Sequence, residues 1–578
     1  MIYRIADNII SPLGETTLEN YQAVKAGASK LHRYDHYRHI PEPFTASLLS
    51  SEQNERLKTE GLTRFEALAY TSISKALRQT TIDPKATNVV LILSTTKGNI
   101  SLLANHPADR SRIYPGTSAR KIALKLGMTT MPVTVCNACI SGVSAIILAL
   151  RLLEAGCYDY AICCGADTQP PFTISGFQSL KAVSDAPCRP FDLERTGLNL
   201  GEAAATIVLE RKVEGGGLKL EGDVWRVEAG AIRNDAFHIS SPSKNGEGAR
   251  LALKAVTEGA GELAFINAHG TATMFNDQME SVAIVRAGLG STPVNAYKGY
   301  FGHTLGTAGL LETILSMAAA DDHTILATKG FEERGVSGNI RLSAAHATTE
   351  KTRFVKMISG FGGCNAAILV ARHEAAPQVA PREENAAPRL RKIHTIRITP
   401  TTLTIDGEEK ACEGEGKARL TDIYKRYIAD YPKFYKMDAL GRLGFVASEL
   451  LLQAENDRKE TPRHDRAVIL FNRSSSILAD EAYQASIEDS ENYYPSPAAF
   501  VYTLPNIVTG EIAIRNHYQG ETSFYILPER DDALIQQIAF ASFGDPATKS
   551  ILGGWLDYAD DEHYEADLYI EEKTSKEK

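Results

Sequence analysis

The sequence has little of what marks disulfide-rich, membrane-spanning or nucleic-acid-binding proteins. Its 578 residues include 8 cysteines, too few and too clustered for a disulfide framework. No run of about 18 apolar residues occurs, and the N-terminus lacks a basic region followed by an apolar core. Lysine and arginine number 62 against 71 acidic residues, and the net charge of −9 disfavours binding to phosphate backbones. We therefore expect a cytoplasmic protein with no membrane span and no nucleic-acid partner.

The remaining composition is that of ordinary globular domains, with 43% hydrophobic and 23% charged residues. Residues 374–390 interrupt it, because prolines, alanines and charges replace any apolar periodicity there, which predicts an interdomain linker. The last residues, 571–578, are nearly all polar or charged and are predicted to form a frayed tail. The chain thus divides into residues 1–373 and residues 391–570.

Before the linker, short β-rich runs alternate with helical stretches. Residues 89–94, 133–135 and 160–164 are β-like, and residues 143–153 have the apolar content of a buried helix. This alternation predicts an α/β fold in which helices cover both faces of the sheet.

A second stretch with the same order of elements follows the linker. The helix-then-strand pattern of residues 62–93 matches that of residues 437–470, and residues 122–126 match residues 512–516. The identity between the two stretches is low, so the match depends on periodicity. It predicts that the chain contains two copies of one unit.

Cys139 is the first candidate for chemistry. It lies between a β-run and a helix, where the helix dipole favours the thiolate and raises nucleophilicity. A buried structural cysteine is the alternative for this position taken alone. Cys136 and Cys139 also form a Cys-x-x-Cys pair, which could indicate a redox pair or half of a zinc site. However, no second well-spaced pair of ligands completes a metal site.

Two histidines extend the candidate site. His269 and His303 each lie in a glycine-rich turn between a predicted strand and a helix, flanked by threonine. In such turns the backbone can approach a substrate closely while the side chain faces a pocket. A single histidine of this kind could be structural, but two in the same setting indicate an active site.

A fourth element is the turn Ser359-Gly-Phe-Gly-Gly-Cys-Asn365, which precedes a last predicted strand. These four elements, in this order and spacing, resemble the β-ketoacyl-acyl-carrier-protein synthase (ketosynthase) family of the thiolase superfamily. The resemblance covers nearly all of residues 1–373. It implies a thiolase-like fold of α-β-α-β-α layers, followed here by a second, partial thiolase-like half.

The resemblance also implies Claisen condensation by covalent catalysis. Cys139 would receive an acyl chain as a thioester, while His269 and His303 would assist decarboxylation of malonyl thioester and stabilise the enolate. The N–H groups of Cys139 and Phe361 would form an oxyanion hole, and the Phe361 ring would gate the cavity. The supporting residues implied are Lys298 with its partner Glu312, and Thr271, Thr273, Gly362 and Gly363 for substrate binding.

The resemblance further implies the partners of the protein. Its substrates would be carried on the phosphopantetheine arm of acyl- and malonyl-loaded acyl carrier protein, with no bound cofactor and no metal. Residues 391–570 resemble the N-terminal half of a ketosynthase but lack the nucleophile, since Cys412 is the single cysteine beyond the linker. This part would act as a noncatalytic partner resembling a chain-length factor, so that the molecule is a dimer or a pseudo-dimer.

Three alternatives remain open. The protein could be a fatty-acid elongation synthase without a specialised product, or a noncatalytic chain-length or scaffold protein that docks acyl carrier protein. It could also be a degradative thiolase, which would need a second cysteine, and Cys364 is the candidate. The intact cysteine and two histidines favour condensation, in fatty-acid, polyketide or aryl-polyene synthesis.

Overall fold

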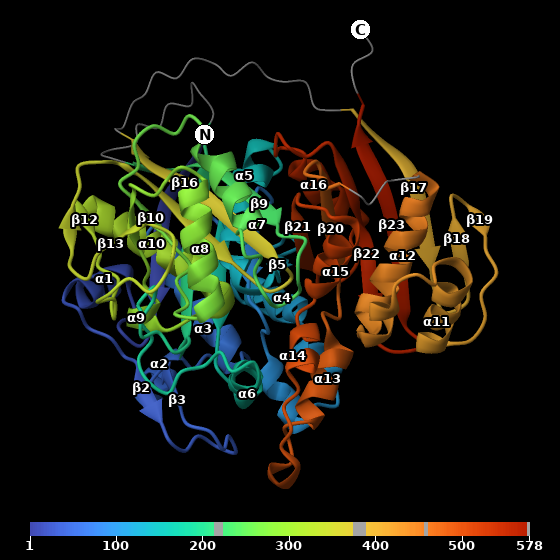
Figure 1. Cartoon of the computed structure of the whole chain (residues 1–578), viewed down its shortest axis with the longest axis horizontal. Helices are drawn as coiled ribbons and strands as arrows, with labels where there is room; N and C mark the ends of the chain where they lie inside the picture. The colour runs from blue at the N-terminus through green and yellow to red at the C-terminus, as the bar shows by residue number, and fades with distance from the viewer. Residues whose placement is uncertain (213–223, 374–388, 456–460, 575–578) are drawn as a thin grey trace.

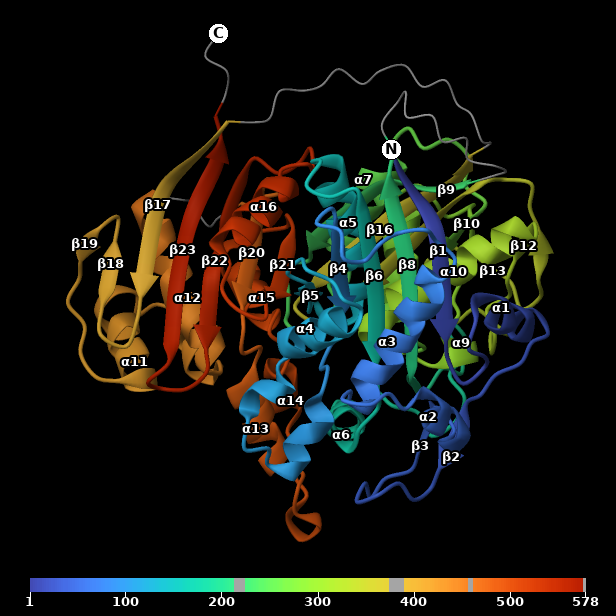
Figure 2. The same ribbon diagram turned by 180° about the vertical axis from the view of Figure 1, so that it is seen from behind.

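The structure is a computed structural model that describes residues 1–212, 224–373, 389–455 and 461–574 (Figure 1). Its largest feature is a mixed sheet with twelve described strands in a row that runs through both parts of the chain (Figure 2). In spatial order the strands are β1 (Ile2–Ile10), β8 (Ala203–Arg211), β6 (Tyr160–Asp167), β4 (Val89–Ser94), β5 (Val133–Val135), β21 (Thr522–Ile526), β20 (Arg466–Asn472), β22 (Ser550–Tyr558), β23 (Tyr564–Lys573), β17 (Leu390–Ile398), β18 (Leu403–Ile405) and β19 (Glu408–Glu409).

A second sheet belongs to the N-terminal part alone. Its strands are β9 (Val224–Asn234), β16 (Cys364–His373), β15 (Arg353–Ser359), β10 (Phe265–Asn267), β11 (Pro293–Asn295) and β13 (Arg341–Leu342). A single pair of residues, Tyr3 and Arg226, joins it to the first sheet. The predicted layers α-β-α-β-α are therefore present, with two sheets separated and flanked by helices.

The layer between the sheets consists of α5 (Ser141–Glu154) and α10 (Ala308–Asp321). Both helices are buried nearly all round, which explains their almost continuous apolar sequences. Their N-terminal ends touch because glycines face each other: a Cβ atom on Gly142 would lie 2.8 Å from the Leu310 nitrogen, and one on Gly309 would lie 2.5 Å from the Val143 nitrogen. The turns that precede the two helices are thereby brought together.

Outer helices cover the exposed faces of the sheets. They are α3 (Arg64–Leu77) and α4 (Pro115–Lys125) on the first sheet, α7 (Glu247–Thr257) and α8 (Met274–Arg286) on the second, and α12 (Ala439–Glu455) and α15 (Ile507–Asn516) in the C-terminal part. The remaining helices and strands are α1 (Thr17–Lys25), α2 (Ser51–Leu57), α6 (Pro171–Ser179), α9 (Lys298–Phe301), α11 (Gly416–Tyr427), α13 (Ile477–Ala485), α14 (Pro497–Tyr502), α16 (Asp532–Ser542), β2 (His32–Tyr34), β3 (Phe44–Ser47), β7 (Leu200–Gly201), β12 (Thr324–Ile325) and β14 (Ala347–Thr348). No helix in the described residues is both long and apolar enough to cross a bilayer.

The internal repeat is visible in the order of the strands. Outward from β5 the strands are β4, β6, β8 and β1, and outward from β21 they are β20, β22, β23 and β17. Strands in equivalent positions of the two sets follow one another in the same order along the chain. Between the sets, β5 pairs with β21 in antiparallel fashion, with Tyr525 opposite Val135 and Ile526 opposite Thr134. The two parts are thus related by a pseudo-twofold axis between these strands.

Strands extend into both the predicted linker and the predicted tail. Residues 374–388 of the predicted linker lie outside the described residues, and Leu390 already begins β17. The predicted tail was wrong in its first residues, because Glu571 pairs with Ile551 of β22 and Lys573 pairs with Leu390 of β17. A strand hydrogen-bonded on both sides is stabilised by its backbone, so polar side chains do not end it.

Buried ion pairs link the two parts beside the central strands. Arg151 of α5 donates to Glu521 at 2.6 Å, and Arg233 of β9 donates to Asp545 at 2.6 Å. Arg151 and Glu521 are at most 5% exposed. A buried pair of this kind adds little stability by itself, but removal of one member leaves an uncompensated charge in the interior.

We therefore expect Arg151→Leu to lower the free energy of unfolding by about 3–5 kcal/mol, since Glu521 loses its cation while it stays buried. The double variant Arg151→Leu/Glu521→Gln should recover much of that loss. Urea denaturation followed by circular dichroism measures both. A single variant that unfolds at the wild-type midpoint would contradict the expectation.

Candidate active site

Cys139 lies where the middle helix α5 begins. It belongs to the short helical turn Ala138–Ile140, which leads directly into α5. Only 8% of its surface is exposed, and it lines a cavity. The residue before it, Ala138, has a φ of 47°, a conformation that costs energy for any residue other than glycine. The Asn137 N–H binds the Ser141 hydroxyl at 2.8 Å, and this bond closes the turn. The thiol is therefore held on a strained, rigid turn.

His269 lies on the turn between β10 and α8. Buried carboxylates fix the backbone of this turn: Glu280 accepts from the N–H groups of His269 and Gly270, both at 2.7 Å, and Asp277 accepts from that of Thr271 at 3.0 Å. The sequence analysis assigned no role to these two acids. Their position explains why they follow the histidine motif on the first turns of α8.

His303 lies between α9 and α10. Its own N–H donates to the Asn199 carbonyl at 2.6 Å, and its Nδ1 accepts from the Leu305 N–H at 3.2 Å. Because Nδ1 accepts a hydrogen bond, the proton of the neutral ring is on Nε2. Nε2 has no partner among the described residues. It is thus a donor available to a molecule in the cavity.

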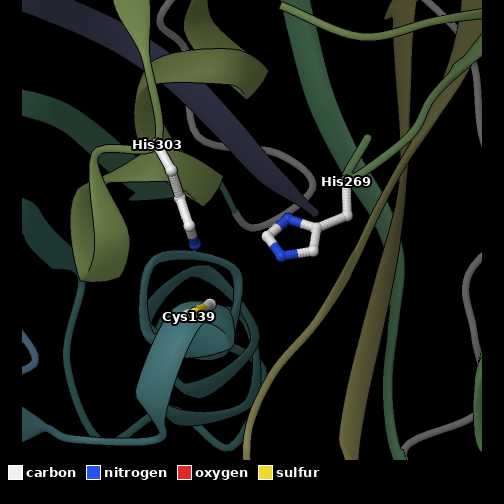
Figure 3. A group of neighbouring side chains, drawn as sticks. All are labelled: Cys139, His269 and His303. Atoms are coloured by element: carbon white, nitrogen blue, oxygen red, sulfur yellow. The ribbon is translucent and has the colours of Figure 1, made fainter. Parts of the chain in front are cut away.

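The three side chains converge from different elements (Figure 3). The Cys139 sulfur and one nitrogen of each imidazole all lie within 4.8 Å of one another, and the two rings meet edge to face with centroids 4.9 Å apart. Such a set could also ligate a metal ion. Two buried lysines beside the imidazoles disfavour a bound cation, however, because like charges repel strongly in a buried site.

Burial sets the protonation states of the site. It lowers the pKa of His269 and of His303 well below the usual value, and the charges of Lys298 and Lys356 lower both further. Both imidazoles are therefore neutral near pH 7. Burial also raises the pKa of the Cys139 thiol to about 12, which opposes the thiolate that the start of a helix is expected to favour.

Sequence reasoning missed Lys356. Its ammonium group donates to the Asn267 side-chain oxygen at 2.8 Å, to the Ala268 carbonyl at 3.1 Å, and to Glu312. Lys298 donates to the His269 carbonyl at 2.6 Å and to the other oxygen of Glu312 at 2.8 Å. Two buried cations thus share one carboxylate and bind consecutive carbonyls beside His269. The sequence did contain a signal for Lys356, since it is the one charged residue within the apolar stretch Phe354–Ile358.

The remaining predicted residues surround a cavity of about 370 Å³. Thr271 and Thr273 line it and lie 2.9 Å apart through their hydroxyls, and Phe361 and Gly363 line it from the other side. Gly362 does not line it; its φ is 88° and its carbonyl accepts from Asn234. A Cβ atom on Gly360 would lie 3.2 Å from the Cys139 nitrogen, so the Phe361 turn lies directly against the nucleophile.

Sequence comparison assigns the chain to a family. Residues 9–215 match the sequence model of the beta-ketoacyl synthase N-terminal domain, and residues 226–332 match that of the C-terminal domain. The chain belongs to the beta-ketoacyl synthase family. A 3-oxoacyl-[acyl-carrier-protein] synthase 2 of Vibrio cholerae is 26% identical over 63% of this chain and 97% of the relative. That of Mycobacterium bovis is 31% identical over 46% of this chain and 67% of the relative.

Solved ketosynthases extend the comparison to the whole molecule. The ketosynthase ApeO of Xenorhabdus doucetiae, in complex with its chain length factor ApeC, is 25% identical, with a TM-score of 0.55 over 64% of this chain and 97% of that one. The PfaC keto synthase–chain length factor structure covers 100% of this chain and 78% of its own, with a TM-score of 0.79 and 14% identity. Both parts of the chain therefore have the ketosynthase fold, as a thiolase-like ketosynthase and a partial second copy.

Lys356→Met provides a test of the charge surplus at the site. Glu312 keeps Lys298 as its cation in this variant, so no buried carboxylate is left unpaired. Removal of one cation raises the pKa of His269 and His303, although burial and Lys298 continue to lower both. The neutral imidazoles are lost as pH falls through that pKa, so the acid limb of malonyl decarboxylation should move to higher pH.

We also expect the maximal rate to fall by about tenfold, because the His269 turn loses a hydrogen-bond donor. Decarboxylation of malonyl-acyl carrier protein, measured from pH 4.5 to 9 by mass spectrometry, gives both quantities. Arg466→Met is the matched control, since Arg466 is equally buried but pairs with Glu455 in the C-terminal part. An unchanged acid limb in Lys356→Met would exclude this electrostatic role.

Proposed function

We propose that the protein condenses an acyl group held on Cys139 with malonyl-acyl carrier protein, with loss of carbon dioxide. The observation that carries this proposal is the convergence of one thiol and two neutral imidazoles on one cavity that Phe361 also lines. Family membership supports the same chemistry, since the relatives are named 3-oxoacyl-[acyl-carrier-protein] synthases.

The first half of the reaction is transfer of the acyl group. The Cys139 sulfur attacks the acyl thioester carbonyl, the bond to the phosphopantetheine sulfur breaks, and the proton lost by Cys139 is taken up by that departing thiolate. Negative charge develops on the carbonyl oxygen, where the N–H groups of Cys139 and Phe361 would stabilise it. A thiol with a raised pKa needs a nearby imidazole to move its proton, and a nitrogen of His269 lies within 4.8 Å of the Cys139 sulfur.

The second half forms the carbon–carbon bond. Loss of carbon dioxide from the malonyl thioester leaves an enolate, whose carbon attacks the acyl thioester on Cys139 and breaks its carbon–sulfur bond. His303 would donate from Nε2 to the enolate oxygen. A fixed hydrogen-bond donor stabilises developing negative charge more strongly in a cavity without water than it does in water. The cavity of about 370 Å³, lined by Thr271 and Thr273, suits a phosphopantetheine arm delivered by acyl carrier protein.

The C-terminal part is proposed to act as a noncatalytic partner that limits chain length. At the position after β21 that corresponds to Cys139 after β5 stands Arg530, whose guanidinium pairs with Asp532, Glu565 and Asp567. Beyond Cys139, on the side away from the larger cavity, Phe500 and Leu504 of this part close a space of about 10 Å³. That space holds about one water molecule, so an acyl chain of any length must displace side chains there.

Phe500 is the side chain best placed to limit the acyl chain. The centroid of its ring lies 5.5 Å from that of the Phe177 ring. The Phe177 ring in turn stacks on the Phe361 ring, with centroids 6.2 Å apart. This part of the proposal favours a polyketide or aryl-polyene type of pathway. The Xenorhabdus doucetiae structure likewise combines a ketosynthase with a chain length factor. The alternatives are a fatty-acid elongation synthase and a noncatalytic protein that docks acyl carrier protein.

The decisive experiment is intact-protein mass spectrometry after incubation with carrier proteins that bear short, long and polyunsaturated acyl groups. We expect the wild type to gain the mass of one acyl group and Cys139→Ala to gain none. The preferred chain separates fatty-acid from polyene elongation. No acylation by any donor would favour the noncatalytic alternative.

Phe500→Ala should allow longer acyl groups to react with Cys139, because it removes the ring that closes the small cavity. We expect the ratio of octanoyl to acetyl transfer to rise about tenfold, with some loss of stability from the new cavity. Phe434→Ala is the matched control, because Phe434 is fully buried in the same part but packs on Tyr424, away from the site. Equal ratios in the two variants would contradict a role for Phe500.

A further inference from the structure

Hydrogen bonds hold three successive carbonyl groups in the backbone of the Phe361 turn. The Phe361 carbonyl accepts from the Asn506 side chain at 2.8 Å, the Gly362 carbonyl from the Asn234 side chain at 2.8 Å, and the Gly363 carbonyl from the Asp235 N–H at 2.8 Å. Asn506 belongs to the C-terminal part of the chain. A residue of the part that lacks a nucleophile therefore binds the turn that lies against Cys139.

Asn506 is placed for this one contact. It directly precedes α15, it is 2% exposed, and its side-chain oxygen has no partner among the described residues. Its amide nitrogen must face Phe361, because two acceptor oxygens would repel each other. The same nitrogen lies 3.8 Å from the Cys364 sulfur, which is itself 3.2 Å from the Phe361 carbonyl. The amide is buried at the cost of one unsatisfied acceptor.

Close backbone contacts reinforce the position of the turn. A Cβ atom on Gly510 of α15 would lie 2.6 Å from the Gly362 carbonyl oxygen, and a Cβ atom on Gly362 would lie 2.8 Å from the Asn506 side-chain nitrogen. On the opposite side, Gly360 lies against the Cys139 backbone. The turn is thus enclosed between Cys139 and α15. Neither Gly362 nor Gly510 has room for a side chain.

The peptide groups on either side of the one that carries the Phe361 N–H are hydrogen-bonded. Before it, the Gly360 N–H donates to the Cys364 carbonyl at 2.8 Å, and after it, Asn506 donates to the Phe361 carbonyl. The peptide group that carries the Phe361 N–H is therefore restrained at both ends. A hydrogen-bond donor to a developing oxyanion is effective only when it is held in place before the reaction.

We propose that Asn506 is a positioning residue, supplied by the C-terminal part, that holds the Phe361 N–H where it binds the thioester oxygen during acyl transfer to Cys139. This inference depends on the proposed condensing activity. It assigns the C-terminal part a role in the rate of acylation that is separate from any effect on chain length.

The test compares Asn506→Leu with Asn516→Leu. Leucine matches asparagine in shape and has no donor. Asn516 is the matched control, because it lies at the other end of α15, is 3% exposed, and has a side-chain oxygen without a partner among the described residues, but its nitrogen donates to Ile512 within that helix. Acylation of Cys139 by acetyl- and hexanoyl-acyl carrier protein is followed by intact mass, and malonyl-acyl carrier protein decarboxylation is measured separately.

We expect Asn506→Leu to slow acylation by about tenfold to a hundredfold while decarboxylation, which depends on His269 and His303, stays within about twofold. Asn516→Leu should leave both rates near those of the wild type. A merely structural defect would lower both rates together. Gly510→Ala, which pushes on the same turn from α15, should give the same division and serves if Asn506→Leu does not fold.

Three results would overturn the inference. Acylation by Asn506→Leu at the wild-type rate, an equal fall in both reactions, or an equal effect of Asn516→Leu would each show that Asn506 does not position the turn. Failure of the wild type itself to acylate would instead refute the condensing activity. The two claims are therefore distinguished by the same set of measurements.

Discussion

The pairing of β5 with β21 is the contact on which the rest of the molecule depends. A sheet that ended at β5 would leave an unpaired edge directly before the turn that carries Cys139. The second copy of the unit covers that edge with its own equivalent strand, so the sheet continues without interruption from one part of the chain into the other. The same pairing brings α15 against the Phe361 turn and Phe500 against the small cavity beyond Cys139. One interaction between backbones thereby positions both contributions of the C-terminal part to the site.

A second constraint is electrostatic. The site is buried, yet it contains Lys298, Lys356, Glu312 and Glu280 close to the two histidines. Each charge is hydrogen-bonded to a backbone group of the catalytic turns or to an opposite charge, which is the condition under which buried charges are tolerated. Their arrangement keeps the imidazoles neutral and fixes the His269 turn at the same time. Charge and geometry are thus determined by the same few side chains.

Much of this site could be predicted from the sequence, because its signals are local. Glycine and threonine around His269 and His303 mark turns that need an unusual backbone, and Cys139 stands between a strand and a helix. Lys298 and Glu312 were paired correctly through the family resemblance. Lys356 and Asn506 could not be found in this way, because their partners lie far along the chain and neither is part of a recognisable motif. The raised pKa of Cys139 could not be predicted either, because burial cannot be read from a local pattern.

The sequence by itself determined the alternation of strands and helices, the repeat, and the candidate side chains of the site, since periodicity and turn chemistry are properties of neighbouring residues. Only the tertiary structure decided how the two copies meet. Contacts such as that of Asn506 with Phe361 join residues from opposite sides of the pseudo-twofold axis, and their existence depends on the register of β5 against β21. A register is a relation between two segments, so no single segment specifies it.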